Sequence, residues 1–306
     1  MFRRVVFLLL AVFVLASTVQ TAKLSAEPDF RTCGPECRHY DLVVIGSEIE
    51  GVLLARAAKR EGLGVLILDP REAPGGQLIQ AQMQVLDEPR HNGESLVQGE
   101  IRRLYTAYNN RKIRKAEEFN AYFAGLLKNI PIENGIRIVS ADIADIAGAG
   151  GMKAVDSLTY IAKDGQTRQV KADYWVENTD FNALTGLLGV PRIPGVETIY
   201  NSPQPEYMAA TLMLKFKNVN WFLLHATVLA HYPIPNVERI FGPNTYVNRS
   251  FATGFSNITE KYKPRDPQLF LRGINATYQR DGEAIMNALL VFGVDPHTGY
   301  TGLLAG

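Results

Sequence analysis

Two glycines that frame a short polar segment have the clearest chemical potential in this sequence. The segment is Gly46-Ser47-Glu48-Ile49-Glu50-Gly51. It lies between an apolar run and a pattern typical of a helix. Gly46 permits a sharp turn out of a strand, and Gly51 permits close packing of the helix on that strand. The helix that starts near Ile49 would point its free N–H groups and positive dipole end at an anion, so the spacing predicts a pyrophosphate site.

An acidic side chain follows at the distance that a dinucleotide-binding unit requires. Asp69 closes a second apolar run, about 20 residues after the glycine segment, where a carboxylate can accept hydrogen bonds from an adenosine ribose. A loop with the sequence Gly75-Gly76-Gln77 comes soon after it. The pair of an anion-binding turn and a distal acid predicts the ADP half of a dinucleotide.

One position in the glycine segment departs from the usual fingerprint. Glu48 stands where a middle glycine normally lets the backbone approach the pyrophosphate. A carboxylate there repels phosphate unless its side chain turns away or binds the ribose. A generic strand–turn–helix without a dinucleotide is therefore the alternative interpretation of this segment.

The elements that must position these residues form a βαβ unit. A buried strand at 41–45 leads through the glycine turn into a helix at 52–60, and a second buried strand follows at 65–68. The crossover between the two parallel strands is expected to be right-handed. Farther along, the pattern predicts helices at 96–108 and 115–128, a strand at 136–139, a hairpin of 155–162 and 166–172 around Asp164-Gly165, and another buried strand at 174–176.

The texture of the sequence changes after Pro191. Proline, asparagine and aromatic residues become frequent, and short runs at 209–216 and 288–292 are typical of strands. We predict a boundary near residues 190–205, with an α/β domain over 40–190 and a β-rich substrate or cap subdomain over 191–306.

The glycine segment and its surroundings resemble a known family. Residues 40–52 are similar to the opening of FAD-dependent oxidoreductases of the glutathione-reductase-like superfold, and specifically to a bacterial branch whose loop reads Gly-Gly-Glu-Pro-Glu-Gly. Glu48 is usual in that branch. Residues 66–69 and 75–78 resemble the acidic ribose contact and the double-glycine loop that passes the flavin. Residues 172–179 resemble the later strand, which usually ends in an Ala-Thr pair, and 287–293 is a weaker echo. The resemblance covers roughly 40–295.

The resemblance implies an α/β fold with a Rossmann-type FAD-binding parallel sheet, helices on both faces and a β-rich second subdomain. It implies FAD as cofactor and oxidoreduction of a small organic substrate, with an electron acceptor that the sequence leaves unknown. The cofactor-binding residues that it implies are Gly46, Ser47, Glu48, Ile49, Glu50, Gly51, Asp69, Pro70, Arg71, Gly75, Gly76, Gln77 and Thr179.

Members of this family close with a second FAD-contacting strand and helix near the C-terminus. No second glycine-rich segment follows in this sequence. A truncated or non-catalytic remnant of the FAD fold, with a binding or structural role, is therefore the rival interpretation. A NAD-linked dehydrogenase would keep Asp69 but would leave the double-glycine loop unexplained.

The sequence assigns no catalytic residue. His225 and His231 lie in the region of the substrate subdomain and are candidates for proton transfer, although a core histidine is the commoner outcome in an apolar stretch such as 221–230. The chain has no Gly-x-Ser-x-Gly, His-Glu-x-x-His or phosphate-loop lysine pattern, and we predict no metal site.

The first residues are typical of an export signal. Arg3 and Arg4 precede an apolar run over 5–16 that ends in small residues, so we predict a signal peptide within 1–26 and a location outside the cytoplasm. An uncleaved signal would be the protein's only link to a membrane. In an oxidising compartment Cys33 and Cys37 are expected to form a small structural disulfide, in preference to a redox or metal site.

The overall charge argues against a nucleic-acid partner. The 306 residues carry a formal net charge of +1, and no stripe of alternating basic and aromatic residues is present. The expected partners are a small-molecule substrate and an electron acceptor.

Overall fold

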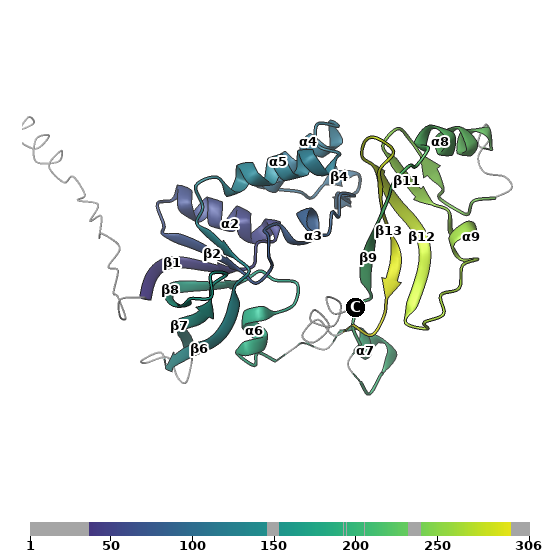
Figure 1. Ribbon diagram of the computed structural model, residues 1–306. Coiled ribbons are helices and arrows are strands. Elements are labelled where there is room, and N and C mark those ends of the chain that lie inside the picture. The colour runs from purple at the N-terminus through teal and green to yellow at the C-terminus, as the bar shows by residue number, and fades with distance from the viewer. Residues whose placement is uncertain are drawn as a thin grey trace, which may run out of the picture.

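A computed structural model describes residues 37–145, 153–204 apart from Arg192 and Pro194, 206–231 and 240–294. The predicted signal peptide and Cys33 lie outside these residues. Two main sheets stand side by side, and helices cover one side of the first (Figure 1). Within the described ranges, no helix has both the length and the apolar character that crossing a bilayer requires.

The first sheet has six strands in the order β5-β2-β1-β8-β7-β6. The four strands β5, β2, β1 and β8 run parallel, and β7 and β6 continue the sheet antiparallel. The strand bounds are β1 Cys37–Ile45, β2 Val65–Asp69, β5 Ile132–Asn134, β6 Arg137–Asp145, β7 Lys153–Ile161 and β8 Thr167–Glu177. The βαβ unit and the hairpin predicted from the sequence are confirmed.

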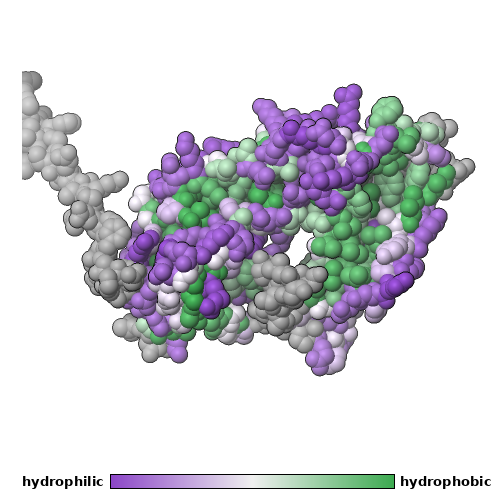
Figure 2. All heavy atoms as spheres, in the orientation of Figure 1, coloured by the Kyte–Doolittle hydropathy of each residue, from purple (hydrophilic) through white to green (hydrophobic). Residues whose placement is uncertain are grey.

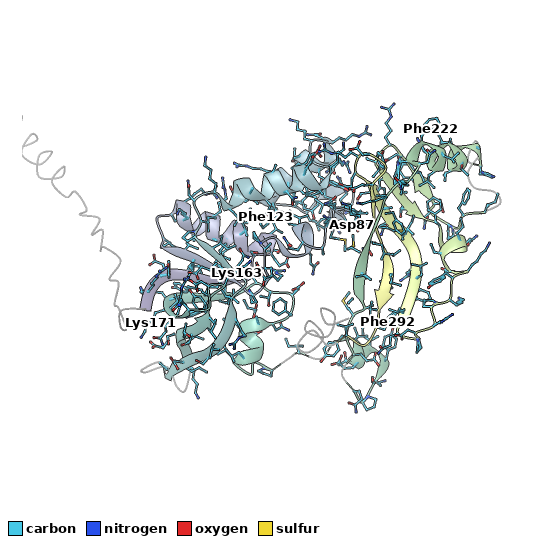
Figure 3. All side chains as sticks on the ribbon, in the orientation of Figure 1. Asp87, Phe123, Lys163, Lys171, Phe222 and Phe292 are labelled. Atoms are coloured by element: carbon cyan, nitrogen blue, oxygen red, sulfur yellow. The ribbon has the colours of Figure 1, made fainter. Side chains whose placement is uncertain are left out.

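Helices α2, α4 and α5 cover one face of the parallel strands. Their bounds are α2 Ile49–Arg60, α4 Ile101–Asn109 and α5 Ala116–Leu127. Val52 and Ala55 of α2 pack with Val44 and Ile67 of the strands, because α2 keeps an apolar side that the βαβ crossover turns toward the sheet. Phe123 of α5 points into this layer and is buried (Figure 3).

The opposite face differs from the expectation of helices on both sides. Among the described residues, one short helix, α6 (Ala183–Leu187), packs there through Leu184. The rest of the cover comes from the sheet itself, since Leu158, Tyr160 and Val170 pack with Val43 and Ile45. The antiparallel strands β7 and β8 therefore contribute to this core in place of a second helical layer.

The predicted separate strand at 174–176 was wrong in one respect. These residues continue the second hairpin strand, so that β8 forms one element of eleven residues that pairs with both β7 and β1. Tyr174 is largely exposed. The alternating pattern of the hairpin and the apolar run are two parts of one strand, the second of which lies beside β1.

The second sheet is antiparallel, with the order β10-β11-β12-β13-β9. Its bounds are β9 Ala210–Phe216, β10 Tyr246–Val247, β11 Phe251–Gly254, β12 Leu269–Tyr278 and β13 Ala284–Val291. Helix α8 (Trp221–Ala230) packs on it through Trp221 and Val228, whereas Phe222 points into solvent (Figure 3). The smaller elements are α3 Gly76–Ile79, β3 Arg90–His91, β4 Glu94–Ser95, α7 Val196–Tyr200 and α9 Ser256–Thr259.

Two side chains, Gln279 and Asn287, connect the second sheet to the part of the chain that covers the first sheet. Gln279, in the turn after β12, accepts a hydrogen bond from the Ala116 N–H at 2.8 Å and donates one to Gln84 at 3.1 Å. The Asn287 amide of β13 contacts the Met83 sulfur at 3.4 Å. The second sheet therefore contacts the loop that follows α3, and its β9 edge lies nearest to the first sheet (Figure 1).

Candidate functional site

The glycine turn joins β1 to α2 and packs tightly against the end of β8. Gly46 has a φ of 95°, which favours glycine, and a Cβ placed there would overlap the carbonyl oxygen of Asn178. The Gly51 N–H donates a hydrogen bond to the Asn178 side-chain oxygen at 3.0 Å. Both framing glycines are therefore required by the close approach of one residue on the neighbouring strand.

The N-terminus of α2 retains anion-binding capacity. The N–H of Gly51 is satisfied by Asn178, and the N–H of Val52 begins the helical ladder by donating to the Glu48 carbonyl. Among the described residues, no partner is found for the N–H groups of Ile49 and Glu50. These two amides lie at the positive end of a twelve-residue helix, where a phosphate is favoured.

Asp69 ends β2 beside this turn, and its carboxylate is directed into the protein. The residue is fully buried. The Ser47 hydroxyl donates to one of its oxygens. Arg71 donates to it from its backbone N–H at 2.9 Å, from Nε at 3.1 Å and from Nη2 at 3.2 Å. Asp69 thus anchors Ser47 and Arg71 in this conformation, and its predicted role at the ribose stays a prediction.

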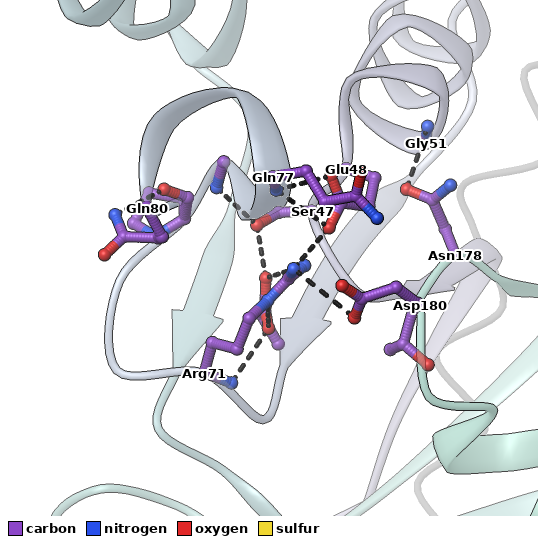
Figure 4. Close-up of polar contacts among 12 residues, drawn as sticks. Ser47, Glu48, Gly51, Arg71, Gln77, Gln80, Asn178 and Asp180 are labelled. Carbon is purple, nitrogen blue, oxygen red and sulfur yellow. Dashed lines mark hydrogen bonds and ion pairs between the residues drawn. The ribbon is translucent and has the colours of Figure 1, made fainter. Parts of the chain in front are cut away.

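The double-glycine loop contacts the glycine turn directly (Figure 4). The Gly75 N–H donates to the Ser47 hydroxyl at 3.0 Å. The Gln77 N–H donates to the Glu48 carboxylate at 3.0 Å, and the same carboxylate pairs with the Arg71 guanidinium. We call Ser47, Glu48, Asp69, Arg71, Gly75 and Gln77 the loop-bridging network. It brings the two predicted cofactor loops together.

The loop-bridging network contains more carboxylates than cations, because the one guanidinium of Arg71 lies near several carboxylates. Arg71, whose side chain is only 8% exposed, contacts Glu48 and Asp69, and its Nη1 lies 3.9 Å from an oxygen of Asp180. Burial alone would lower the pKa of Arg71, but its hydrogen bonds and attraction to Asp69 and then Glu48 raise it above the ordinary value. Burial raises the pKa of Glu48, although Arg71 and the Gln77 N–H oppose that effect.

Thr179 is held by its own strand end and by α6. Its hydroxyl donates to Glu177 at 2.7 Å and accepts the Ala183 N–H at 3.0 Å. Glu177 also accepts the N–H groups at the start of α6, from Leu184 at 2.6 Å and Thr185 at 3.0 Å. The structure thus explains Thr179 by helix capping, and its predicted contact with the cofactor remains a prediction.

Sequence reasoning missed two residues of this region, Asn178 and Asp180. Both follow β8, which pairs with β1 in parallel up to the register Ile45↔Glu177. The signal that could have found them is positional, because the residues after adjacent parallel strands meet at the same sheet edge. The remaining predicted residues have ordinary positions. Pro70 follows directly after β2, Ile49 packs on the hydrophobic core, and the Glu50 side chain is exposed.

The two candidate histidines lie far from the glycine loops. His225 is on α8, and His231 caps its C-terminus; α8 lies on the side of the second sheet that is farther from α2 and α3 (Figure 1). His231 Nδ1 lies 2.8 Å from the Thr227 carbonyl oxygen, and its ring meets Phe241 edge-on. The structure therefore does not bring either histidine to the predicted cofactor site. Among the described residues, no cluster of three or more metal-binding side chains is found.

The parallel sheet, the crossover and the glycine turn define a Rossmann-type nucleotide-binding protein. The sequence matches the FAD dependent oxidoreductase family over residues 41–302. The chain therefore belongs to this family, and FAD is its cofactor. The two unpaired amides of α2 fit the pyrophosphate, and the double-glycine loop lies beside them as expected for that cofactor.

Similar solved structures include several longer proteins. A flavoprotein/dehydrogenase from Cytophaga hutchinsonii is 11% identical, with a TM-score of 0.43 over 83% of this chain and 56% of that chain. The myxobacterial chondrochloren halogenase CndH, a FAD-dependent halogenase, is 12% identical, with a TM-score of 0.41 over 87% and 57%. The anhydrotetracycline hydroxylase OxyS from Streptomyces rimosus is 12% identical, with a TM-score of 0.39 over 83% and 45%.

The chain thus spans about half the length of these structures, from 45% to 57%. The search of curated proteins gave no match.

Proposed function

We propose that this protein is a FAD-dependent oxidoreductase that oxidises or reduces a small organic substrate and exchanges electrons with a second, unidentified partner. The observation that carries the proposal is the junction of the two cofactor loops. Ser47 and Glu48 of the glycine turn contact Gly75 and Gln77 of the double-glycine loop, beside two α2 amides that have no partner among the described residues.

The bound flavin supplies the hydride or electron chemistry, and the chain supplies position and electrostatics. In the proposed complex the N–H groups of Ile49 and Glu50 bind the pyrophosphate, since they are the unpaired donors at the α2 N-terminus. Gly46 permits the turn that aims these donors. Gly75 and Gly76 let the second loop pack closely, since a Cβ at position 75 would overlap Ile79 and one at position 76 would overlap the Glu48 carboxylate.

We propose that the substrate binds between the two sheets. Figure 2 shows the molecule hollowed there, with apolar side chains on the side of the second sheet. That side also carries polar groups, because Asn287 reaches Met83 and Thr253 donates to Asn275 at 2.8 Å. A largely apolar wall with a few polar groups suits a small organic molecule.

The N-terminal pattern supports the further proposal that the protein is exported, with any membrane attachment limited to an uncleaved signal. The mass of the mature chain, purified from outside the cytoplasm, tests this proposal. A chain that keeps residues 1–26 and stays in the cytoplasm would contradict it.

The cofactor is tested by incubating the purified chain with FAD, desalting it and recording the visible spectrum. Retained flavin absorbance that candidate substrates bleach without oxygen supports an oxidoreductase. A folded chain that retains no flavin contradicts the proposal.

A non-catalytic protein with the FAD fold is the second candidate function. The observation in its favour is that Asp69 is wholly enclosed by Ser47 and Arg71, so its carboxylate is not offered to a ribose. The same spectrum separates the two candidates. A folded chain that retains no flavin, or whose bound flavin none of the candidate substrates bleaches, would favour the second.

A further inference from the structure

The Glu48 carboxylate lies where an anionic ligand of the two cofactor loops would be expected. It accepts the Gln77 N–H with both oxygens, at 3.0 and 3.2 Å, and it pairs with Arg71. Its side chain is only 13% exposed. A backbone N–H and a guanidinium that converge on two oxygens are the donors with which proteins bind phosphate. Here the chain's own side chain uses them.

Gly76 shows how closely the carboxylate approaches the second loop. Its φ is 40°, and a Cβ placed there would overlap the Glu48 carboxylate itself. The absence of a side chain at position 76 is therefore needed already without cofactor. The double glycine accommodates Glu48 as an internal anion.

Arg71 is the only cationic side chain that contacts Glu48 among the described residues. Asp69 fixes its backbone N–H, Nε and Nη2, which leaves Nη1 for Glu48. A second carboxylate, Asp180, lies 3.9 Å from the same Nη1. An incoming pyrophosphate would add negative charge to a corner in which three carboxylates already share one cation.

We propose that Glu48 competes with the cofactor for its binding site: the Glu48 carboxylate occupies the anion corner formed by Arg71 and the Gln77 N–H, next to the α2 amides, and the pyrophosphate must displace it. This inference rests on the proposed function, since it assumes that FAD binds at the two loops. It predicts that the wild-type protein binds nucleotide diphosphates more weakly than a variant in which Glu48 carries no charge.

The test compares the affinity of the full chain for ADP, the half of FAD that carries the pyrophosphate, between the wild type and Glu48→Gln. Glutamine keeps the size and the acceptor for Gln77 but removes the charge that binds Arg71. We expect Glu48→Gln to bind ADP about tenfold more tightly, because a charge-assisted internal hydrogen bond no longer competes. Isothermal titration calorimetry measures this without any turnover.

Glu72→Gln is the matched control. It removes the same charge one residue from Arg71, but the Glu72 carboxylate is 80% exposed and pairs with Lys163 at 2.7 Å. We expect its affinity for ADP to equal that of the wild type. An equal gain in both variants would show general repulsion of anions and would overturn the competition.

A second measurement needs no variant. The backbone amide resonance of Gln77 and the Nη1 resonance of Arg71 should shift in the wild type as ADP saturates the chain, because Glu48, the carboxylate partner of both groups, is exchanged for phosphate. Unchanged resonances in the saturated protein would overturn the proposal.

The remaining outcomes separate this inference from the proposed function. If Glu48→Gln binds ADP more weakly than the wild type, Glu48 is a direct contact of the nucleotide and the competition is wrong, while the proposed function stands. If neither the wild type nor Glu48→Gln binds ADP or FAD, the proposed function is wrong, and the proposed competition by Glu48 is wrong with it.

Discussion

Replacing Gly51 by alanine tests the packing at the start of α2. An alanine inside a helix normally stabilises it, by about 1 kcal/mol relative to glycine. In this structure the added Cβ would overlap the Asn178 side-chain oxygen and would lie 2.9 Å from Val44 Cγ1. Asn178 would have to rotate and would lose its hydrogen bond with the Gly51 N–H. We therefore expect Gly51→Ala to destabilise the protein.

Two costs oppose the gain in helix propensity. An unpaired buried N–H costs about 1–3 kcal/mol, and overpacking against the wholly buried Val44 costs about 1–3 kcal/mol. After the gain of about 1 kcal/mol is subtracted, the net loss is about 1–5 kcal/mol. Urea unfolding followed by circular dichroism measures it, provided that the slope of the transition is unchanged.

Two further variants make the result specific. Gly125→Ala changes a glycine of α5 that has nothing within 4 Å of the added Cβ, and it should be neutral or stabilise the protein by up to about 1 kcal/mol. In the Asn178→Ala background the cost of Gly51→Ala should fall by about 1–3 kcal/mol, since one of its two clashes is gone. A Gly51→Ala protein as stable as Gly125→Ala would refute the described contact between α2 and the end of β8.

Three predictions concern the loop-bridging network, and urea unfolding checks each. Ser47→Ala should cost about 1–3 kcal/mol, because it leaves a buried N–H and a buried carboxylate oxygen without a partner; an unchanged midpoint would contradict those contacts. Arg71→Met should lower the free energy of unfolding by about 3–5 kcal/mol, because it leaves the buried Asp69 carboxylate without a cation. Arg168→Met is the control: it breaks two more exposed ion pairs and should cost at most about 1 kcal/mol per pair. Equal losses of stability in the two variants would refute the argument from burial. Burial raises the pKa of Glu48, so native Glu48 holds its proton to higher pH than unfolded Glu48, and stability should fall as pH rises through that window. Glu48→Gln should flatten this part of the profile, and an identical slope in both proteins would show that Glu48 does not titrate there.

The βαβ unit was predictable because each of its features is local. The runs at 42–45 and 65–68 are apolar without alternation, as strands buried on both faces must be, and the structure buries them. The Asp164-Gly165 hairpin was equally local, since Gly165 has the positive φ that such a turn requires. The strand limits were less predictable, because tertiary pairing extends β1 back to Cys37 and joins 174–176 to the hairpin.

The partners of the glycine turn could not be predicted for a different reason. Asn178 is 127 residues from Gly51 in sequence, and only the parallel pairing of β8 with β1 brings them together. The periodicity of β8 says that it is a strand but not which strand it joins. The role of Asp69 was hidden in the same way, since its burial depends on where Arg71 folds back.

Ser47 and Glu48 can be understood together as one change in the cofactor-binding turn. Ser47 stands where the branch that this turn resembles has glycine, and Glu48 stands where the strict dinucleotide fingerprint has glycine. Both use their side chains to reach the double-glycine loop, Ser47 at Gly75 and Glu48 at Gln77. Gly76 then has to lack a side chain, because the Glu48 carboxylate fills that space. The glycines lost from the first loop thus make the glycine in the second one necessary. Polar side chains in the turn are therefore compatible with a cofactor fold, because a second loop is shaped to receive them.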